Sequence, residues 1–472
     1  MNIEIKLTTE DIIKAVSGIL INGDMGISFK GISTDTRIIR PGYLFWALKG
    51  KNFDGHDFFR VSLKKGAKGM VFSYFPRGFK IEEIPKTISI ILVKDSLKAL
   101  GDLANFWKKR INPIIVAITG SCGKTTTKEI TYEIVSKFFI SAKNWENYNN
   151  LIGVPLSILS MKEGTKVGIL ELGTNQKGEI ERLSKIVEPK ISVITSIYPS
   201  HLEGLDSIKG VLEEKISLFK NTHPKGTLIY NFDQEILKNS VKNFPQNKIS
   251  FGFSPEADIS FQNLSLKNGK IRGSIIFNTK AYDLEINNIG KHNLLNLLAA
   301  LAVAISLGID LEKIIPLFEK EISLFQRAKF LNKGPHLIID DTYNANPGSV
   351  KASLEYFKEL ASNYQKKIVI LGEMKELGKE SEKYHKEIGK LVNKIADIAL
   401  FIGETASYYA EGFKSYDTKN KFYRIFDSVE KFLEIWPIKE FFKKEEKNII
   451  LVKGSRALKM ERIVEKLVEE NS

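Results

Sequence analysis

The stretch IIVAITGSCGKTTT, residues 114–127, carries the clearest structural signal in the chain. Its first half is a short apolar run rich in β-branched residues, which predicts a strand, and apolar residues then recur at helical spacing as far as Phe138. A glycine-containing turn between a strand and a helix presents backbone N–H groups and the positive helix end to phosphate oxygens. Lys124 adds a positive charge and Thr125 a hydroxyl for Mg²⁺. We therefore predict a nucleoside triphosphate site that includes Gly120, Ser121, Cys122, Gly123, Lys124, Thr125 and Thr126.

This turn differs from the general phosphate-loop pattern G-x-x-x-x-G-K-[ST]. Ile118 occupies the position of the first glycine, and Gly120 comes two residues later, which leaves the compact form G-x-x-G-K-T. The alternative interpretation is an ordinary glycine-rich turn. The flanking strand and helix favour the phosphate loop, because both are required for phosphate binding.

Composition limits the class of protein. A chain of 472 residues is long enough for about three domains, each with its own core. Its 43% hydrophobic and 27% charged residues are typical of a soluble globular protein. The net charge of +14 raises the question of nucleic acid, yet the lysines are scattered and no RNA-binding aromatic motif or zinc spacing is present. We expect no nucleic-acid partner; an anionic small substrate or a lysine-rich proteome explains the charge as well.

The cysteine content and the length of the apolar stretches indicate in which cellular compartment the protein works. Cys122 is the single cysteine, so an intramolecular disulfide is excluded and a reducing compartment is favoured. Within the phosphate loop we interpret it as a small residue and not as a nucleophile. The start MNIEIKLTTED lacks a signal pattern, and the longest apolar stretch, Leu294–Ile309, is too short to span a bilayer. We expect a cytoplasmic protein without membrane insertion.

The pattern of apolar runs predicts an α/β protein of three domains, at residues 1–85, 86–324 and 325–472. The first is a small α/β domain, the second a mostly parallel sheet of the phosphate-loop NTPase type with an added antiparallel segment, and the third resembles a dinucleotide-binding (Rossmann-like) sheet without its glycine fingerprint. In the first domain we expect a helix at Thr9–Leu20 and a strand at Tyr43–Leu48.

In the second domain strand-length runs alternate with helical patterns. The elements expected are the helix Asp95–Trp107, the strands Val167–Leu170, Ile191–Thr195 and Leu228–Tyr230, antiparallel strands from Ile249 to Ile289 with a hairpin turn at Asn268-Gly269, and the helix His292–Leu307, with the domain closing near Phe325. In the third domain the expected elements are strands His336–Asp340, Ile368–Leu371, Ile398–Ile402 and Ile449–Val452 and helices Gly348–Leu360, Ser381–Lys394 and Ala457–Glu469. The charged run Lys439–Lys447 is interpreted as a solvated face.

Two strand ends of the second domain carry polar residues. Glu171 ends one predicted strand, and His201 and Glu203 follow the next. Because ligands gather at the carboxyl ends of parallel strands, we expect Glu171 and His201 beside the phosphate loop, where they would hold Mg²⁺. Taken singly, the glutamate has a solvated alternative and the histidine a structural one.

The stretch from Gly31 to Phe59 is dense in glycine and small polar residues around a strand. Its composition alone favours a surface loop; the alternative is a site for a polar ligand. The candidate donors and acceptors are Ser33, Thr34, Asp35 and Arg37, followed by Lys49, Asn52, Asp54 and His56.

Several blocks of the sequence resemble those of the Mur ligases. Besides the phosphate loop, they are STDTR (33–37), LKGKNFDGHDF (48–58), NYNNLIGVP (147–155), LELGTNQKGEI (170–180), HLEGLDSI (201–208), GKHNLLNLLAA (290–300), DDTYNANPGS (340–349), LGEMKELG (371–378) and VKGSRALKME (452–461). They occur in the family's order and cover all three domains. The resemblance implies an ATP- and Mg²⁺-dependent ligase of peptidoglycan synthesis, with UDP-N-acetylmuramoyl-tripeptide and D-alanyl-D-alanine as substrates. The third residue of that peptide would be lysine or meso-diaminopimelate, and the ligase a monomer.

The resemblance also implies roles for matching residues. Lys124 and Thr125 would hold the β- and γ-phosphates and, with Glu171, the first Mg²⁺. His201 would bind the second Mg²⁺. Lys215 stands where the family has a carbamylated lysine, which as a carbamate would be an anionic metal ligand. The alternative is a surface lysine in the run Glu-Glu-Lys.

Further implied contacts come from the second and third domains. Arg327 would reach the γ-phosphate, although Gln326 precedes it where the family commonly has glycine. The remaining nucleotide contacts would be His292, Asn293, Asn296, Asp341, Tyr343 and Asn344, with Asn346 near the acceptor. The uridine diphosphate end would meet Ser33, Thr34, Asp35, Lys49 and His56, and the incoming dipeptide Ser455 and Arg456.

Other functions remain to be weighed against this one. A sister ligase that adds the third peptide residue carries, in its meso-diaminopimelate form, a DNPR block that is missing here. A small-molecule kinase or regulatory NTPase has no need of a third domain with DDTYNANPGS and KGSR. A nonenzymatic interaction module would leave Lys124, Glu171 and His201 unexplained.

Overall fold

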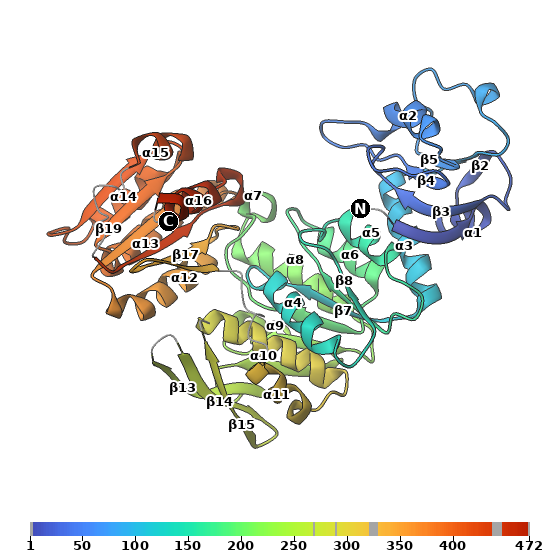
Figure 1. Cartoon of the computed structure of the whole chain (residues 1–472). Coiled ribbons are helices and arrows are strands. Elements are labelled where there is room, and N and C mark those ends of the chain that lie inside the picture. Colours follow the sequence, from blue (N-terminus) through green and yellow to red (C-terminus); the bar gives the residue numbers. More distant parts are fainter. Residues whose placement is uncertain (1–2, 268–269, 288–289, 321–328, 437–445, 471–472) are drawn as a thin grey trace. The chain divides into compact units, whose positions relative to one another are not determined.

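The computed structural model describes residues 3–267, 270–287, 290–320, 329–436 and 446–470 (Figure 1). These residues form three sheets, each accompanied by helices. By compactness the chain divides into two units. The first comprises Met1–Ala117, Phe139–Gly173 and Glu179–Lys190, and the second comprises Ile118–Phe138, Thr174–Gly178 and Ile191–Ser472.

The first sheet of the described residues has the strand order β1-β3-β4-β5-β6-β2, with parallel pairing from β3 to β6 and antiparallel edges. The core on this sheet includes Phe45, Phe59 and Phe72. Its elements are β1 (Ile3–Thr8), β2 (Ile19–Asn22), β3 (Ser28–Ser33), β4 (Tyr43–Trp46), β5 (Gly69–Phe72) and β6 (Ser89–Leu92), with helices α1 (Thr9–Val16), α2 (Phe59–Lys64) and α3 (Ser96–Ile111).

Helix α1 is shorter than the sequence predicts. Thr8 and Asp11 form a capping box at its start, where side chain and backbone bond reciprocally. At its end Ser17 takes a left-handed conformation with φ 51°. A left-handed residue terminates the helical hydrogen bonding, so the helix stops at Val16. The expectation of helix as far as Leu20 is wrong, because Leu20 lies in β2.

The second sheet of the described residues has nine strands in the order β15-β14-β13-β12-β11-β10-β7-β9-β8. Pairing is parallel from β10 to β13 and antiparallel from β13 to β15. The strands are β7 (Ile114–Thr119), β8 (Ser141–Lys143), β9 (Val167–Glu171), β10 (Ile191–Ile194), β11 (Thr227–Asn231), β12 (Asn247–Gly252), β13 (Ile259–Lys267), β14 (Lys270–Phe277) and β15 (Lys280–Asn287). The expected mixed sheet is confirmed, but its antiparallel part begins at β13 and not at Ile249.

Lys267 and Lys270 stand opposite each other across β13 and β14. This register confirms an antiparallel pair connected through two residues, while the predicted turn residues Asn268 and Gly269 lie outside the described residues. The helices of this region are α4 (Lys124–Val135), α5 (Gly153–Leu159), α6 (Glu179–Val187), α7 (Leu202–Leu205), α8 (Ile208–Lys220), α9 (Glu235–Ser240), α10 (Lys291–Ser306) and α11 (Leu311–Lys320). Helix α10 is apolar all round from Leu297 to Ala304 and is buried throughout that stretch, as such a helix must be.

The third sheet of the described residues has the order β16-β17-β21-β18-β19-β20, parallel except for the antiparallel edge strand β16. Its core includes Ile370, Leu400 and Val452. The elements are β16 (Lys329–Lys333), β17 (His336–Asp341), β18 (Lys366–Gly372), β19 (Ile398–Ile402), β20 (Phe422–Phe426), β21 (Asn448–Lys453), α12 (Pro347–Leu360), α13 (Ser381–Ile395), α14 (Ala406–Lys414), α15 (Val429–Ile435) and α16 (Glu461–Glu470).

The four strands predicted for this sheet are confirmed, whereas β16, β20, α14 and α15 were not predicted. Helix α16 begins at Glu461 and not at Ala457, because Lys459 has a left-handed backbone (φ 54°) after a short 3₁₀ turn. Most of the charged run Lys439–Lys447 lies outside the described residues. Among the helices that the described ranges contain, none has both the length and the apolar character needed to cross a membrane.

Candidate functional site

The predicted phosphate loop connects β7 to α4 in the second unit. Gly123 is the N-cap of α4 with φ 82°, and Gly120 has φ 153°. A Cβ at Gly123 would collide with the side-chain oxygen of Asn296, and one at Gly120 with the hydroxyl of Thr195. Both glycines are therefore required by the close approach of neighbouring side chains, and at Gly123 also by the backbone conformation.

Hydrogen bonds from the segment after β10 hold this loop. The Ser121 N–H donates to the Ser196 carbonyl at 2.8 Å, and the Ser121 hydroxyl to the Tyr198 carbonyl at 2.8 Å. The Cys122 N–H donates to the Ser196 hydroxyl at 3.0 Å. The Lys124 ammonium bends back to the loop and donates to the Gly120 carbonyl at 2.9 Å. These protein contacts fix the conformation of the loop.

Helix α10 contributes polar side chains beside the loop. The Thr127 hydroxyl donates to Asn296 Oδ1 at 3.3 Å, and Asn296 Nδ2 donates to Asn293 Oδ1 at 3.1 Å. His292, at the start of the helix, retains some exposed surface, yet its imidazole is packed deeply enough for burial to lower its pKa to about 4. A histidine with that pKa is neutral at physiological pH, so it would contact a ligand through hydrogen bonds and not through charge.

Lys215 lies inside the second unit. Only 1% of this residue is exposed, so the alternative of a surface lysine is wrong. Burial, with a smaller contribution from the charge of Lys124, lowers the pKa of Lys215 to about 7. Its neighbour Glu214 is also buried and accepts hydrogen bonds from the Gly178 N–H at 2.6 Å and the Thr174 hydroxyl at 3.2 Å. Glu214 therefore holds the 174–178 loop, a role that the sequence did not indicate.

Glu171 ends β9 in the first unit, as predicted, and is 2% exposed. Asn149 Nδ2 donates to the Glu171 carboxylate at 2.8 Å. Asn144 Oδ1 accepts the Glu171 N–H, and Asn144 Nδ2 donates to the Glu171 carbonyl, both at 2.9 Å. In the strand order β9 is the neighbour of β7, which the phosphate loop follows. The solvated alternative for this glutamate is wrong, because the side chain is buried and bonded.

His201 precedes α7 in the second unit and has a left-handed backbone with φ 51°. Its Nδ1 lies 2.6 Å from the Oε2 atom of Glu376, and contact with this imidazole lowers the pKa of the Glu376 carboxyl. Glu376 follows β18 and was not predicted to have a role, although it lies in the block LGEMKELG. Within the described ranges no three His, Cys, Asp or Glu side chains gather as a metal-binding group. The predicted ligand set draws also on Thr125 and Lys215, so it need not form such a group.

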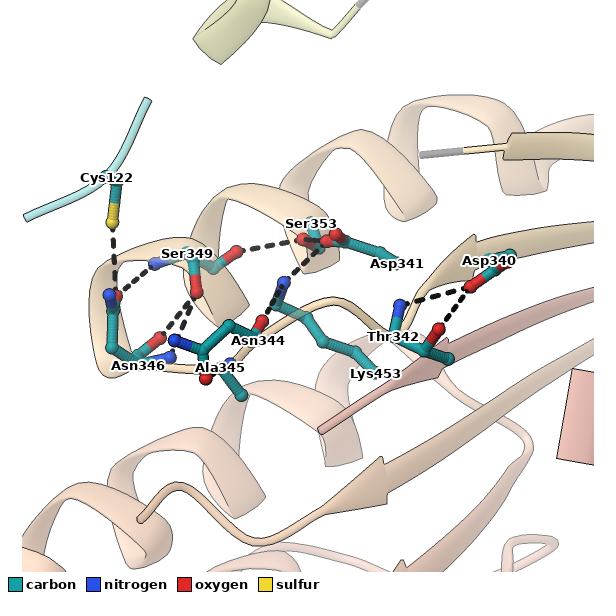
Figure 2. Close-up of polar contacts among 10 residues, drawn as sticks. All are labelled: Cys122, Asp340, Asp341, Thr342, Asn344, Ala345, Asn346, Ser349, Ser353 and Lys453. Carbon is teal, nitrogen blue, oxygen red and sulfur yellow. Dashed lines mark hydrogen bonds and ion pairs between the residues drawn. The ribbon is translucent and has the colours of Figure 1, made fainter. Parts of the chain in front are cut away.

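The third region contributes a network at the ends of β17 and β21 (Figure 2). The buried Lys453 donates to Asp341 Oδ2 at 2.6 Å and to the Asn344 carbonyl at 3.0 Å, and the Ser353 hydroxyl donates to the same carboxylate oxygen at 2.5 Å. Lys453 thereby connects two strand ends. It was not among the predicted site residues, although the block VKGSRALKME contains it.

Asn346 links this network to the phosphate loop within the second unit (Figure 2). Its Oδ1 accepts the Ser349 N–H at 2.9 Å, which caps α12, and also the Cys122 thiol at 3.1 Å. Its Nδ2 donates to the Ser121 carbonyl at 3.2 Å. Burial raises the pKa of the Cys122 thiol, so the thiol stays protonated and donates. This agrees with the interpretation that Cys122 is not a nucleophile.

The residues predicted to meet the dipeptide differ in exposure. Ser455 is buried, and its hydroxyl accepts the Lys375 N–H at 2.8 Å. Arg456 is exposed and lies 3.3 Å from Glu461. Ser455 therefore holds the backbone at Lys375, whereas the side chain of Arg456 is accessible to a ligand. Arg327, predicted to reach the γ-phosphate, lies outside the described residues, as does Gln326.

The residues predicted for the uridine diphosphate end share one edge of the first sheet. Because β3 and β4 run parallel, Ser33 at the end of β3 and Lys49 beyond the end of β4 lie at the same side of the sheet. The Ser33 hydroxyl donates to the Asp35 carbonyl at 2.9 Å, and Asp35 pairs with Arg37 at 2.6 Å. Thr34 lies between them and is partly exposed.

His56, also predicted to meet the uridine diphosphate end, is held by protein partners in this structure. It is fully buried: its Nδ1 lies 2.7 Å from Asp54 Oδ1, and its Nε2 accepts the Ser73 N–H at 3.0 Å. Its ring stacks on Tyr74 with centroids 4.0 Å apart. We interpret His56 as a support for the loops after β4 and β5, so any effect on a ligand would pass through its neighbours.

The fold and the site together define a nucleotide-binding protein with a phosphate loop and three β-sheets, each accompanied by helices. Family models match three segments of the chain: "Mur ligase family, catalytic domain" at residues 28–108, "Mur ligase middle domain" at 118–304, and "Mur ligase, glutamate ligase domain" at 326–456. These matches cover more than half of the chain. The chain belongs to the Mur ligase family, which confirms the resemblance and the predicted fold class.

Full-length relatives and solved structures agree with this assignment. The UDP-N-acetylmuramoyl-tripeptide--D-alanyl-D-alanine ligase of Bacillus subtilis is 33% identical over 98% of this chain and 99% of its own length. A crystal structure of MurF from Acinetobacter baumannii has a TM-score of 0.89 at 28% identity, covering 99% of this chain and 100% of that one. MurF ligase from Thermotoga maritima in complex with ADP has a TM-score of 0.81 at 27% identity, covering 93% and 97%.

Proposed function

We propose that the chain is an ATP-dependent ligase that joins D-alanyl-D-alanine to the terminal carboxylate of UDP-N-acetylmuramoyl-tripeptide. Relatives with that activity in their names match this chain from end to end. Within the structure, the observation that carries the proposal is the buried Lys215, whose pKa of about 7 is affected by the phosphate-loop Lys124. A kinase or regulatory NTPase gives no reason for a buried lysine whose pKa responds to the charge of Lys124.

ATP would be bound by the phosphate loop, with Lys124 turning from the Gly120 carbonyl to the β- and γ-phosphates. His292, Asn293 and Asn296 at the start of α10 would contact the nucleotide as neutral hydrogen-bonding groups. Further contacts are proposed from Ser121, Cys122, Thr126, Asp341, Tyr343 and Asn344, and from Arg327 to the γ-phosphate.

Mg²⁺ would be held by Thr125, Glu171, His201 and Lys215. The donors fit this ion, because hydroxyl, carboxylate and carbamate groups supply the oxygen ligands that it prefers. When bound, the ion neutralises charge on the phosphoryl group during its transfer. A neutral lysine amine adds to CO₂ with loss of a proton, and a pKa of about 7 leaves much of Lys215 neutral at physiological pH. We propose that Lys215 is carbamylated in this way.

The reaction proposed has two steps. The tripeptide carboxylate attacks the γ-phosphorus of ATP, which releases ADP and forms an acyl phosphate. The amine of the dipeptide then attacks the acyl carbon, phosphate leaves from the tetrahedral intermediate, and an amide bond remains. Lys124 stabilises the negative charge of the transferring group, and the closing domains keep out water that would hydrolyse the acyl phosphate.

Each sheet is proposed to serve one substrate. The first domain would bind the uridine diphosphate end through Ser33, Thr34, Asp35 and Lys49, with His56 acting through its neighbours. We propose that this domain ends beyond residue 85, since β6 (Ser89–Leu92) pairs within the same sheet. The second domain would bind ATP, and the third the dipeptide through Asn346, Ser455 and Arg456. We further propose a cytoplasmic monomer without a nucleic-acid partner.

A coupled assay tests the function. The purified chain is incubated with ATP, Mg²⁺, D-alanyl-D-alanine and UDP-N-acetylmuramoyl-tripeptide with either lysine or meso-diaminopimelate at the third position. We expect a pentapeptide product by mass spectrometry and one phosphate released for each bond formed. Phosphate release that ignores both peptide substrates would instead favour an NTPase. Addition of a single amino acid to the UDP-dipeptide would favour the sister ligase.

A further inference from the structure

The contact between His201 and Glu376 joins residues 175 positions apart in the sequence (376 − 201) but within one compact unit. Nδ1 and Oε2 lie 2.6 Å apart, although the angle departs from that of a well-formed hydrogen bond. A carboxylate and an imidazole at this distance attract each other electrostatically. His201 is largely buried and Glu376 is about half exposed, so the pair lies at the border of the protein interior.

Both partners have an unusual backbone. His201 has φ 51° and Glu376 has φ 66°, in the left-handed region that disfavours residues with a side chain. Such conformations persist only where surrounding contacts impose them, and they concentrate at functional sites. Two of them meeting in one close side-chain contact indicates that this juxtaposition is built into the fold.

The loop that carries Glu376 is fixed from the side of the third sheet. The Met374 N–H donates to Nε2 of the buried His385 at 3.0 Å, and the Lys375 N–H donates to the Ser455 hydroxyl at 2.8 Å. Consecutive residues on the N-terminal side of Glu376 are thereby held by two different elements. The backbone that leads into Glu376 is therefore fixed at two consecutive residues.

The same loop is fixed from the side of His201. The Glu203 N–H donates to the Glu376 carbonyl at 3.4 Å, and a Cβ added at Gly378 would lie 3.4 Å from the Glu203 side chain. The residues that follow His201 therefore contact the residues that follow Glu376. This arrangement keeps the carboxylate on Nδ1 and leaves Nε2 as the ring nitrogen that a metal can use.

We propose that Glu376 is a positioning residue for His201. Its carboxylate holds the proton of His201 on Nδ1 and orients the ring, so that Nε2 is the metal ligand. Histidines that bind metals commonly donate their other N–H to a carboxylate, which fixes the tautomer and raises the basicity of the ligating nitrogen. The inference rests on the proposed function, in which His201 binds Mg²⁺. Because the carboxylate comes from the third region, metal affinity depends on the docking of that region.

The test measures metal binding and the tautomer, without turnover. The variants are Glu376→Ala, Glu376→Gln and His201→Ala. The matched control is Glu380→Gln, which changes a partly exposed glutamate of the same connection that pairs with Lys383. Mn²⁺ binding to each protein with a nonhydrolysable ATP analogue is followed by electron paramagnetic resonance. Nitrogen chemical shifts of His201 in the metal-free proteins report its tautomer; the chain has 6 histidines, so assignment by substitution is practical.

We expect Glu376→Ala to weaken Mn²⁺ binding by about 10- to 100-fold, the usual effect of removing such a partner, and to mix the tautomers. Glu376→Gln keeps an acceptor for Nδ1–H and should lie between Glu376→Ala and the parent. Glu380→Gln should match the parent. If Glu376→Ala fails to fold, Glu376→Gln carries the same comparison.

Two results would overturn the inference. Unchanged Mn²⁺ affinity in the Glu376 variants, with weakened binding in His201→Ala, would remove the positioning role and leave the metal site intact. Tighter binding in Glu376→Ala would mean that the carboxylate competes with the metal for His201. Unchanged binding in His201→Ala is a different failure, because it would contradict the proposed ligand set itself.

Discussion

Lys124 is the residue on which phosphate binding depends most directly. We expect Lys124→Ala to lower kcat/KM for ligation by about 100-fold or more, because an aligned charge at the transferring phosphoryl group is lost. The measurement is phosphate release coupled to product formation. Lys185→Ala, which removes an exposed lysine paired with Glu181, is the control and should retain the parent activity. Undiminished ligation by Lys124→Ala would contradict the phosphate-loop assignment.

Lys215 makes the stability of the protein depend on pH. Its pKa is lowered from 10.5 to about 7 in the folded protein, so between these values the unfolded chain binds the proton and the folded chain does not. Its contribution to stability is therefore greatest above pH 10.5, falls as pH decreases toward 7, and is constant below.

We expect Lys215→Met to be more stable than the parent at pH 7 in CO₂-free buffer, because a buried amine is replaced by an apolar group of similar length. The gain should shrink as pH rises from 7 to 10.5, while ligase activity is lost at every pH. Thermal unfolding across this range measures both. A constant difference in Tm over the whole window would show that Lys215 titrates normally.

At the scale of single elements, the turn before α4 makes a specific demand on Gly123. An alanine there would need a left-handed backbone and would also collide with Asn296. Gly164 has a similar φ of 88°, but an added Cβ there would meet no atom within 4 Å. Gly164→Ala should cost about 1 kcal/mol of stability without affecting ATP binding. Gly123→Ala should lose ATP binding as well, measured by titration calorimetry; equal effects of the two substitutions would exclude the collision as the cause.

The start of α12 makes another demand, on Asn346. Removing this N-cap with Asn346→Ala should lower the free energy of unfolding by about 1 kcal/mol and also weaken ATP binding, because the contacts to Ser121 and Cys122 disappear. Ser428 caps α15 in the same way without touching the loop. Ser428→Ala should therefore lose similar stability and retain ATP affinity. If both variants bind ATP equally well, the contacts of Asn346 with Ser121 and Cys122 do not contribute to ATP binding.

The elements that the sequence predicted correctly are those with strong local signals. β19, at Ile398–Ile402, is an unbroken apolar run, and Glu171 ends its strand as expected. The missed strand β20 lies at a sheet edge, and its burial follows no two-residue alternation: Phe422 and Ile425 are exposed and Phe426 is buried. Its hydrophobic pattern is therefore weak. The end of α1 was missed because a single left-handed serine terminates it, and sequence periodicity does not detect a backbone conformation.

The site residues also divide into those that a local sequence pattern predicted and those that it did not. Phosphate-loop residues were recognisable because their order follows a local motif. The burial of Lys215 and the pairing of His201 with Glu376 depend on contacts between distant segments, which no local pattern encodes. The family resemblance implied a ligand-binding role for His56, and the structure adds that both of its ring nitrogens have protein partners, which the sequence did not indicate.

At the scale of the whole molecule, the net charge of +14 acts on all substrates at once. Summed positive charge attracts anions and is screened by salt, with a Debye length of about 10 Å at 0.1 M. We expect KM for the UDP-linked peptide to rise with KCl concentration more steeply than KM for the zwitterionic dipeptide. Initial rates at varied KCl measure both, with tetramethylammonium chloride as a control salt. If the two KM values rise equally with KCl concentration, the net charge does not contribute to binding of the UDP-linked peptide.

The reactivity of the Cys122 thiol can be used to follow the contact between the phosphate loop and α12. Cys122 is the chain's only cysteine, it is held protonated, and its hydrogen bond is to the residue that caps α12. An alkylating reagent competes with that bond for the sulfur atom, so the labelling rate should rise in any variant that breaks the contact between the loop and the helix. Bound nucleotide, which we propose contacts Cys122 itself, should slow the labelling, and the ratio of rates with and without ATP would measure how far the nucleotide protects the loop.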